Sequence, residues 1–196
     1  MKPPNVTLDN MCIIDLEQNR ENAPHIRRLI QMHHNREINL RVVAASASEL
    51  KQDRKTHPQH IDEFKQRMKS TGLNDVDVLP TLLYLGVSFI GYCLMSGRWL
   101  SKLDKEIHTI LFSENETEYP SFCQKHGYNP KNKEKWTDWV NMKCDVLTLW
   151  SHIWYNGYVF VTRDKNFLEE TKKRKLVELG AGKILRPIEA VKFLDC

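Results

Sequence analysis

The run YVFVT at residues 158–162 is strongly β-forming, and it leads directly into RDKNF at residues 163–167. Gly157 separates this run from a helical pattern over residues 136–155, and a second helical pattern follows it over residues 166–179. A short apolar strand between two helices is typical of the α/β class, in which helices connect neighbouring parallel strands. We therefore predict that residues 158–162 form one strand of a mostly parallel sheet.

The rest of the chain repeats this alternation of short apolar strands with helices. Further strands are predicted at residues 6–8, 40–45, 76–80 and 183–185. Further helices are predicted at about residues 22–36, from Pro58 to Gly72, after Thr81, at residues 99–111 and at residues 187–194. The polar stretch 113–135 is predicted to be an irregular loop. This order of elements predicts an α/β fold with helices on both faces of the sheet.

Length and composition indicate one globular domain. The chain has 196 residues, of which 41% are hydrophobic and 28% charged, so residues 1–196 can bury a core of their own. A net charge of +4 is compatible with a nucleic-acid partner and does not require one. Five widely spaced cysteines form no CxxC pair. This pattern argues against a disulfide framework or a zinc ribbon and favours reduced thiols in a cytoplasmic protein.

One uncharged segment, residues 78–97, is long enough to cross a bilayer. Pro80 and three glycines interrupt it, and Asp77 and Arg98 bound it closely. We therefore expect a buried strand end followed by a buried helix, and no membrane contact. The N-terminus contains no apolar stretch of the signal-peptide type.

Four acidic residues are predicted to gather at one edge of the sheet. Asp9 follows the first strand, Glu49 lies in the first turn after the second, and Asp164 lies two residues beyond the YVFVT strand. The carboxyl ends of parallel strands meet at one edge, where sites of this class lie. Asp145 opens a helical stretch that descends about 18 Å before the chain reverses. The strand then returns about 16 Å, which brings Asp145 back to the level of Asp164.

Four neighbouring carboxylates repel one another unless a cation compensates their charge. All-oxygen ligands favour Mg²⁺ or Mn²⁺ over Zn²⁺, and such ions support the hydrolysis of phosphodiesters. Each acid taken alone also has a structural interpretation as a helix cap or a first-turn charge. Glu49, for example, completes a capping-box pattern with Ser46.

These residues together resemble the PIN domain, a family of metal-dependent ribonucleases. The resemblance rests on VTLD at 6–9 with IIDL at 13–16, SEL at 48–50, Asp145, and VFVTRDKNF at 159–167. The last of these is similar to the family's strand-T-x-D-x-x-F pattern. The resemblance covers most of the chain. It implies a PIN-like three-layer α/β/α sandwich around a mostly parallel sheet of about five strands.

The activity implied by the resemblance is that of a Mg²⁺- or Mn²⁺-dependent endoribonuclease. Its catalytic and metal-holding residues would be Asp9, Glu49, Asp145 and Asp164. Stand-alone small members are often toxins, so by analogy the partners would be RNA, a protein antitoxin and a second copy of the chain. The segment of about residues 97–136 is longer than is usual in the family, and the resemblance gives it no role.

The residues that would support the metal follow from the same resemblance. The Thr162 hydroxyl would orient a carboxylate or a water, and Asn166 would contact metal-bound water or phosphate. Asn10 would take the place of the small polar residue that the family carries after its first aspartate. Met11 departs from the family pattern, because a thioether cannot bond a carboxylate well.

Basic residues indicate where RNA could lie. The candidates are Arg163 and Lys165, which flank Asp164, Lys172 and Lys173 in a basic run, and Lys131, Lys133 and Lys135 in the polar loop. Tyr128 and Trp136 lie among the loop lysines and could stack unpaired bases. The alternative for the basic run is a solvated helix face. Trp139, Trp150 and Trp154 are interpreted as packing residues.

Two other functions are compatible with this sequence. One is a PIN-like module that binds RNA or protein without cutting, which the methionine at position 11 and the enlarged segment favour. The other is a phosphotransfer protein using Asp9 as acceptor, although no lysine is well placed near a strand end. Cleavage of RNA without action on small phosphomonoesters would distinguish the nuclease from the phosphotransfer protein.

Overall fold

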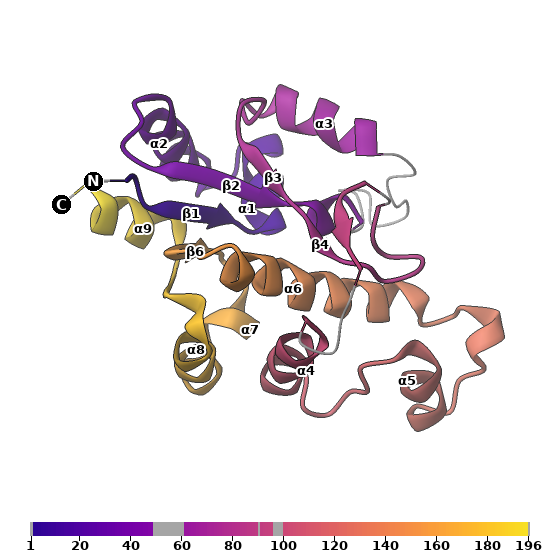
Figure 1. Ribbon diagram of the computed structural model, residues 1–196. Coiled ribbons are helices and arrows are strands. Elements are labelled where there is room, and N and C mark those ends of the chain that lie inside the picture. The colour runs from indigo at the N-terminus through magenta and orange to yellow at the C-terminus, as the bar shows by residue number, and fades with distance from the viewer. Residues whose placement is uncertain (1, 49–60, 90, 96–99, 196) are drawn as a thin grey trace.

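The computed structural model describes residues 2–48, 61–89, 91–95 and 100–195. Its centre is a sheet of five strands in the order β3-β2-β1-β6-β7, and every neighbouring pair is parallel (Figure 1). The strands are β1 (Asn5–Leu8), β2 (Asn39–Val43), β3 (Asp77–Leu79), β6 (Val159–Val161) and β7 (Lys183–Leu185). The α/β class and the parallel sheet predicted from the sequence are therefore confirmed.

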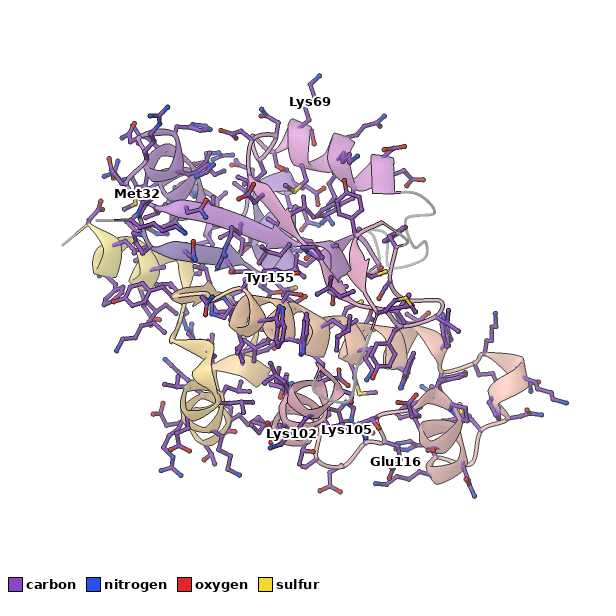
Figure 2. The ribbon with its side chains drawn as sticks, viewed as in Figure 1. Met32, Lys69, Lys102, Lys105, Glu116 and Tyr155 are labelled. Carbon is purple, nitrogen blue, oxygen red and sulfur yellow. The ribbon has the colours of Figure 1, made fainter. Side chains whose placement is uncertain are left out.

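Successive side chains of each strand point to opposite faces of the sheet, and a layer of helices covers each face. Val6 and Leu8 of β1 point into one hydrophobic cluster, which also contains Met32 (Figure 2), while Phe160 of β6 points into the other. The first cluster packs under α1 (Asn10–Glu17), α2 (Ala23–His34), α3 (Ile61–Ser70) and α9 (Pro187–Leu194). The second packs under α4 (Leu100–Leu111), α6 (Trp136–Trp154) and α8 (Glu170–Leu176). The arrangement is a three-layer sandwich.

Helix α6 is fixed to the centre of the sheet by a polar contact. His152 is fully buried, and its Nε2–H donates to the carbonyl of Ala181 at 2.9 Å. Its Nδ1 therefore accepts the hydroxyl proton of Thr7 in β1, also at 2.9 Å. Burial lowers the pKa of His152 to about 4, so the imidazole is neutral at physiological pH.

The uncharged segment after Pro80 does not form the predicted helix. It contains two short parallel strands, β4 (Thr81–Leu82) and β5 (Cys93–Leu94). Gly86 and Gly91 have φ of +78° and +93°, which turn the chain back on itself. The Ser88 hydroxyl donates to the Leu82 carbonyl at 2.5 Å and fixes that turn. None of the helices in the described part of the chain is long and apolar enough to span a membrane.

Other predicted boundaries also need correction. Residues 113–135 were expected to be irregular, but they contain α5 (Tyr119–Lys125) and a 3₁₀ turn (Pro130–Asn132). Helix α5 forms because Tyr119, at its start, packs edge-on against Trp136 with ring centroids 4.9 Å apart. Strand β2 ends at Val43, before the predicted Ala45, and the chain continues into a 3₁₀ turn (Ala44–Ala47).

The predicted helix 166–179 is divided into three pieces. They are α7 (Lys165–Leu168), α8 and a π-helical turn, η3 (Val177–Ala181). The break lies at Glu169, whose backbone is extended with ψ of 124°. Its carboxylate accepts the N–H groups of Thr171 and Lys172 at 2.9 and 3.2 Å and so begins α8. This break turns α8 toward the end of α4.

Candidate functional site

The order of the strands defines the place where a site is expected. From β1 the chain builds β2 and β3 on one side and then crosses to β6 and β7 on the other. The topological switch point therefore lies between β1 and β6, which pair through Leu8 and Val161 at their carboxyl ends. Crevices at such a point are the usual ligand sites of open α/β sheets. Asp9 and Thr162 are the next residues of these two strands.

Asp9, Thr162 and Asp164 form a hydrogen-bonded chain across this point. The Thr162 hydroxyl donates to Oδ2 of Asp9 at 2.6 Å and accepts the backbone N–H of Asp164 at 2.9 Å. Asp164 in turn accepts the backbone N–H of Asn166 at 2.8 Å and caps α7. Thr162 thus links the two strand-end aspartates, and its bond to Asp9 is of the kind that the family resemblance implied.

The surroundings of Asp9 destabilise the charged form of its carboxyl group. Asp9 is 3% exposed, and burial raises the pKa of its carboxyl from 3.8 to about 6. The negative charge of Asp164 adds to the rise in this pKa. The Thr162 hydroxyl and the N–H groups at the start of α1 oppose it. A cation near Asp9 and Asp164 would remove the repulsion and offset the loss of hydration.

Asp145 and Asp164 line one cavity of ≈ 430 Å³. Asp145 lies in the middle of α6, because that helix begins nine residues earlier at Trp136. The expectation that Asp145 opens a helix is therefore wrong. Its height relative to the strand ends follows from the part of α6 that comes after it, and both carboxylates line the same cavity.

The opposite wall of the cavity comes from the segment that the sequence left without a role. Ser113, Glu114 and Asn115 follow α4 and line the cavity. The Nε2–H of the buried His108 donates to the Asn115 carbonyl at 2.9 Å, and His126 donates to its side-chain oxygen at 3.0 Å. Sequence reasoning missed this wall, because it depends on contacts from α5, which was not predicted.

Lys172 brings a positive charge into the same cavity. Its Nζ donates to the Leu111 carbonyl at 2.9 Å and to the side-chain oxygen of Asn166. Lys172 was predicted as an RNA contact within a basic run, and in the structure it lines the same cavity as Asp145 and Asp164. Asn166 links this lysine to the aspartate chain, because its own N–H binds Asp164.

The remaining predicted site residues lie elsewhere or outside the described residues. Glu49 belongs to residues 49–60, which the structure does not describe. Asn10 is buried, and its side-chain oxygen accepts from Arg67 of α3 at 3.0 Å. Arg163 forms an ion pair of 2.9 Å with the fully buried Asp15. This pair ties the loop that carries Thr162 to α1.

We call the cavity lined by Asp145 and Asp164 the carboxylate cavity, and the other lysines predicted to bind RNA do not line it. Lys165 is exposed beside Asp164, and Lys173 is half-buried on α8. In the α5–α6 connection Lys131 and Lys133 are exposed, while Lys135 pairs with Asp138 at 2.9 Å. Lys135 and Lys133 also lie over the rings of Tyr128 and Trp136, at 5.7 and 5.9 Å from the ring centroids. The predicted interleaving of lysines with aromatic rings is therefore present, at a distinct surface.

The chemistry of the donors at the site fits Mg²⁺ or Mn²⁺, because carboxylate, hydroxyl and amide oxygens surround it. Burial, with an additional contribution from the charge of Asp164, raises the pKa of Asp9, and a cation bound nearby would lower it again. Within the described residues, however, no three His, Cys, Asp or Glu side chains are grouped closely enough to hold a metal ion. No disulfide joins the four described cysteines, and Cys12 and Cys144 are buried.

Comparisons with known proteins add no relative: no protein-family model, no curated protein and no solved structure matches the chain.

Proposed function

We propose that the protein is a PIN-like, Mg²⁺- or Mn²⁺-dependent ribonuclease that hydrolyses RNA phosphodiester bonds. The observation that carries the proposal is the cavity lined jointly by Asp145 and Asp164, with Asp9 tied to Asp164 through Thr162. Helix capping does not explain these carboxylates, because Asp145 lies within α6 and Asp9 makes no side-chain cap bond to α1. The family resemblance agrees with this reading of the site.

Each residue of the site has a separate role in the proposed reaction. Asp145 and Asp164 line the cavity that would hold the ion, and Asp9 is linked to Asp164 through Thr162. An ion bound there would supply a water nucleophile at neutral pH and stabilise charge on the phosphate. Thr162 keeps Asp9 and Asp164 oriented through its two hydrogen bonds. Lys172 lines the same cavity, and its ammonium group would neutralise a phosphate oxygen that enters it.

A second candidate function is RNA binding without cleavage. It is favoured by the absence of a three-ligand group within the described residues and by Lys172, which brings a positive charge into the cavity that Asp145 and Asp164 line. In this case the aspartates would serve to hold Lys172 and the surrounding loops in place. Metal binding separates the two candidates.

The test is incubation of the purified protein with mixed-sequence single-stranded RNA in Mn²⁺, in Mg²⁺ and in chelator. Asp145→Asn and Asp164→Asn should each abolish cleavage, because each removes a carboxylate of the cavity. Asp138→Asn is the matched control, since Asp138 lies on the same helix and is exposed. Cleavage that survives both variants, or that needs no metal, contradicts the proposal. If the protein neither cleaves nor binds metal in calorimetry, the second candidate replaces the first.

A further inference from the structure

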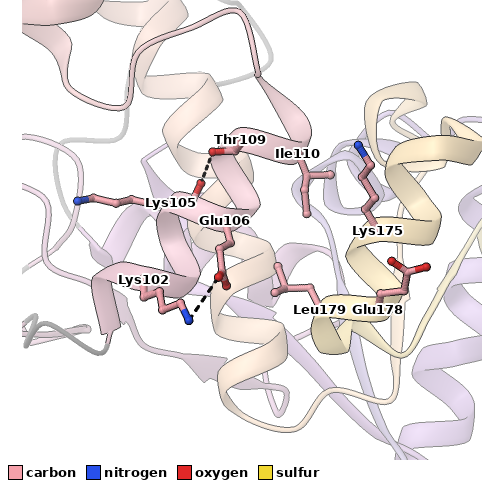
Figure 3. Close-up of a pocket in the computed structure, with 8 residues that line it drawn as sticks. All are labelled: Lys102, Lys105, Glu106, Thr109, Ile110, Lys175, Glu178 and Leu179. Carbon is pink, nitrogen blue, oxygen red and sulfur yellow. Dashed lines mark hydrogen bonds and ion pairs between the residues drawn. The ribbon is translucent and has the colours of Figure 1, made fainter.

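A groove runs along the seam between α4 and α8. Its first part is a cavity of ≈ 550 Å³, where Ile110 of α4 and Leu179 of η3 face each other (Figure 3). Its second part, of ≈ 390 Å³, shares Leu179 and extends to Trp154 at the end of α6. We call this the α4–α8 groove, formed by Lys102, Glu106, Ile110, Lys175, Leu179 and Trp154.

The α4–α8 groove and the carboxylate cavity are lined by neighbouring residues of the same two helices. Leu111 and Lys172 line the carboxylate cavity, whereas Ile110 and Lys175 line the groove. Ile110 directly precedes Leu111, and Lys175 follows Lys172 by about one helical turn. Helices α4 and α8 pack against each other and contribute residues to both hollows.

The charges at the rim of the groove favour an anionic occupant. Glu106 pairs with Lys102 at 3.7 Å, and Glu178 pairs with Arg174 at 3.9 Å. Both pairs are exposed and therefore weak. Lys175 has no ion-pair partner within the described residues, and Figure 3 shows its side chain beside Ile110. Its ammonium group is available to a phosphate at the entrance of the groove.

The far end of the groove offers a flat aromatic surface. Trp154 is 37% exposed, and its ring stacks on the fully buried Trp150 with centroids 5.4 Å apart and planes 10° apart. Trp150 thereby fixes the plane of Trp154. The expectation that both residues serve packing holds for Trp150, while Trp154 keeps a large part of its surface in the solvent. Exposed rings beside lysines are the usual platform for unpaired bases.

We propose that the α4–α8 groove binds single-stranded RNA next to the bond that is cut, with a phosphate on Lys175 and a base stacked on Trp154. Only an unpaired strand presents base faces to such a platform, so a duplex should be excluded. The inference rests on the proposed nuclease function for the direction of the strand, and it moves the RNA path away from the lysines of the α5–α6 connection.

The experiment measures binding separately from cleavage. The full chain is titrated, in chelator, into a fluorescein-labelled 2′-O-methyl oligouridylate of about twelve nucleotides, and anisotropy is recorded at several salt concentrations. Lys175→Glu should weaken binding at least about fivefold at low salt and lower the salt slope by roughly 0.7, the value for one phosphate of a single strand. Lys69→Glu is the control, because Lys69 is exposed on α3 in the other helical layer (Figure 2).

Two substitutions test the aromatic platform. Trp154→Ala should weaken binding about tenfold, whereas Trp154→Phe keeps a stacking surface and should bind within about twofold of the wild type. Circular dichroism of each variant establishes that it is folded. Equal losses for the two substitutions would point to packing alone and overturn the stacking assignment. A competing duplex should not displace the oligouridylate.

The outcomes separate this inference from the nuclease proposal. If wild-type protein cleaves RNA but Lys175→Glu and Trp154→Ala bind the oligouridylate normally, the groove is not the RNA-binding site, and the nuclease proposal is unaffected. If both variants lose binding but the wild type cleaves no RNA, RNA binding in the groove is supported and the nuclease proposal is rejected. If the wild type does not bind the oligouridylate even at low salt, the inference is overturned and the groove is left to a protein partner.

Discussion

Asp9 shows which properties of a candidate site residue follow from the sequence and which follow only from the fold. Its position directly after a strand follows from the sequence, but its burial and its contact with Thr162 follow only from the fold. A buried carboxylate beside a second carboxylate prefers to be neutral, and the pKa of Asp9 is accordingly raised to about 6. The native state therefore holds a proton that the unfolded chain releases at lower pH.

This linkage predicts a measurable dependence of stability on pH. The native pKa is raised above 3.8, so the contribution of Asp9 is fully present below about pH 4 and is lost as the pH rises through about 6. In chelator, Asp9→Asn should remove this decline and be more stable than the wild type at pH 7, by up to about 3 kcal/mol. Urea denaturation of both proteins between pH 4 and 8 measures the difference. A difference that does not change with pH would contradict the raised pKa.

The residues of the candidate site differ in how well the sequence predicts them. Asp9 and Asp164 follow strands, so strand prediction alone places them at one edge of the sheet. Asp145 was placed from the helical stretch that follows it, and it lies within α6, which agrees with the predicted helix 136–155. The contact of Lys172 with Asn166 could not be predicted, because it depends on the break at Glu169 that turns α8 toward the cavity.

At the scale of elements, α4 is attached to α6 by a buried ion pair. Lys143 and Asp104 are each 1% exposed and lie 3.6 Å apart, and the Tyr84 hydroxyl donates to Asp104 at 2.8 Å. The Lys143 ammonium also lies 4.1 Å from the centroid of the Tyr84 ring. Burial lowers the pKa of Lys143, so its charge depends on this partner. The same helix, α6, carries Asp145.

Removing one partner should cost more than removing both. Asp104→Ala leaves the buried Lys143 charge without compensation and should destabilise the protein by about 3–5 kcal/mol. The double variant Asp104→Leu with Lys143→Met replaces the pair by apolar side chains and should recover most of that loss. Denaturant midpoints of the three proteins provide the measurement. If the double variant were as unstable as the single one, packing and not charge would explain the effect.

A second prediction concerns the turn between η3 and β7. Gly182 has φ of +61°, and a Cβ at this position would lie 2.4 Å from the Tyr158 carbonyl oxygen. Gly182→Ala should therefore destabilise the protein by about 2–4 kcal/mol through strain and displaced backbone. Gly72→Ala is the control, because its φ of +78° is similar and nothing lies within 4 Å of the added Cβ. It should cost only about 1–2 kcal/mol. Equal losses in thermal unfolding would show that the close contact has no effect.

Helices and strands were predicted correctly where the spacing of apolar residues in the sequence corresponds to the face that is buried. The strands of the sheet and helix α4 follow from apolar patterns that the structure buries. Prediction failed after Pro80, where an apolar stretch was taken for a helix although Gly86 and Gly91 adopt positive φ. Apolar composition alone does not distinguish a buried helix from two short strands with tight turns. It also failed at α5, whose formation depends on packing against Trp136 and Trp139.

At the scale of the whole molecule, stability should be unevenly distributed. Strand β1 has a parallel partner on each side and a helical layer on each face, whereas β4 and β5 pair only with each other. Hydrogen exchange should therefore be slowest in β1, β2 and β6, with opening free energies close to that of global unfolding. Amides of β4, β5 and α5 should exchange much faster. Mass spectrometry of peptic fragments measures both groups, and uniform protection across them would contradict the expectation.

The centre of the sheet also has a consequence for the protein while it is being made. Asp9 and Thr162, which share a hydrogen bond, are 153 positions apart in the chain, and β1 pairs with β6 across a similar interval. On a ribosome, β1 must wait for most of the polypeptide to emerge before its second neighbour exists. A chain released early, before residue 162, contains Asp9 but cannot assemble the carboxylate cavity. If the protein cuts RNA, an incomplete chain therefore cannot cleave the messenger RNA from which it is being translated.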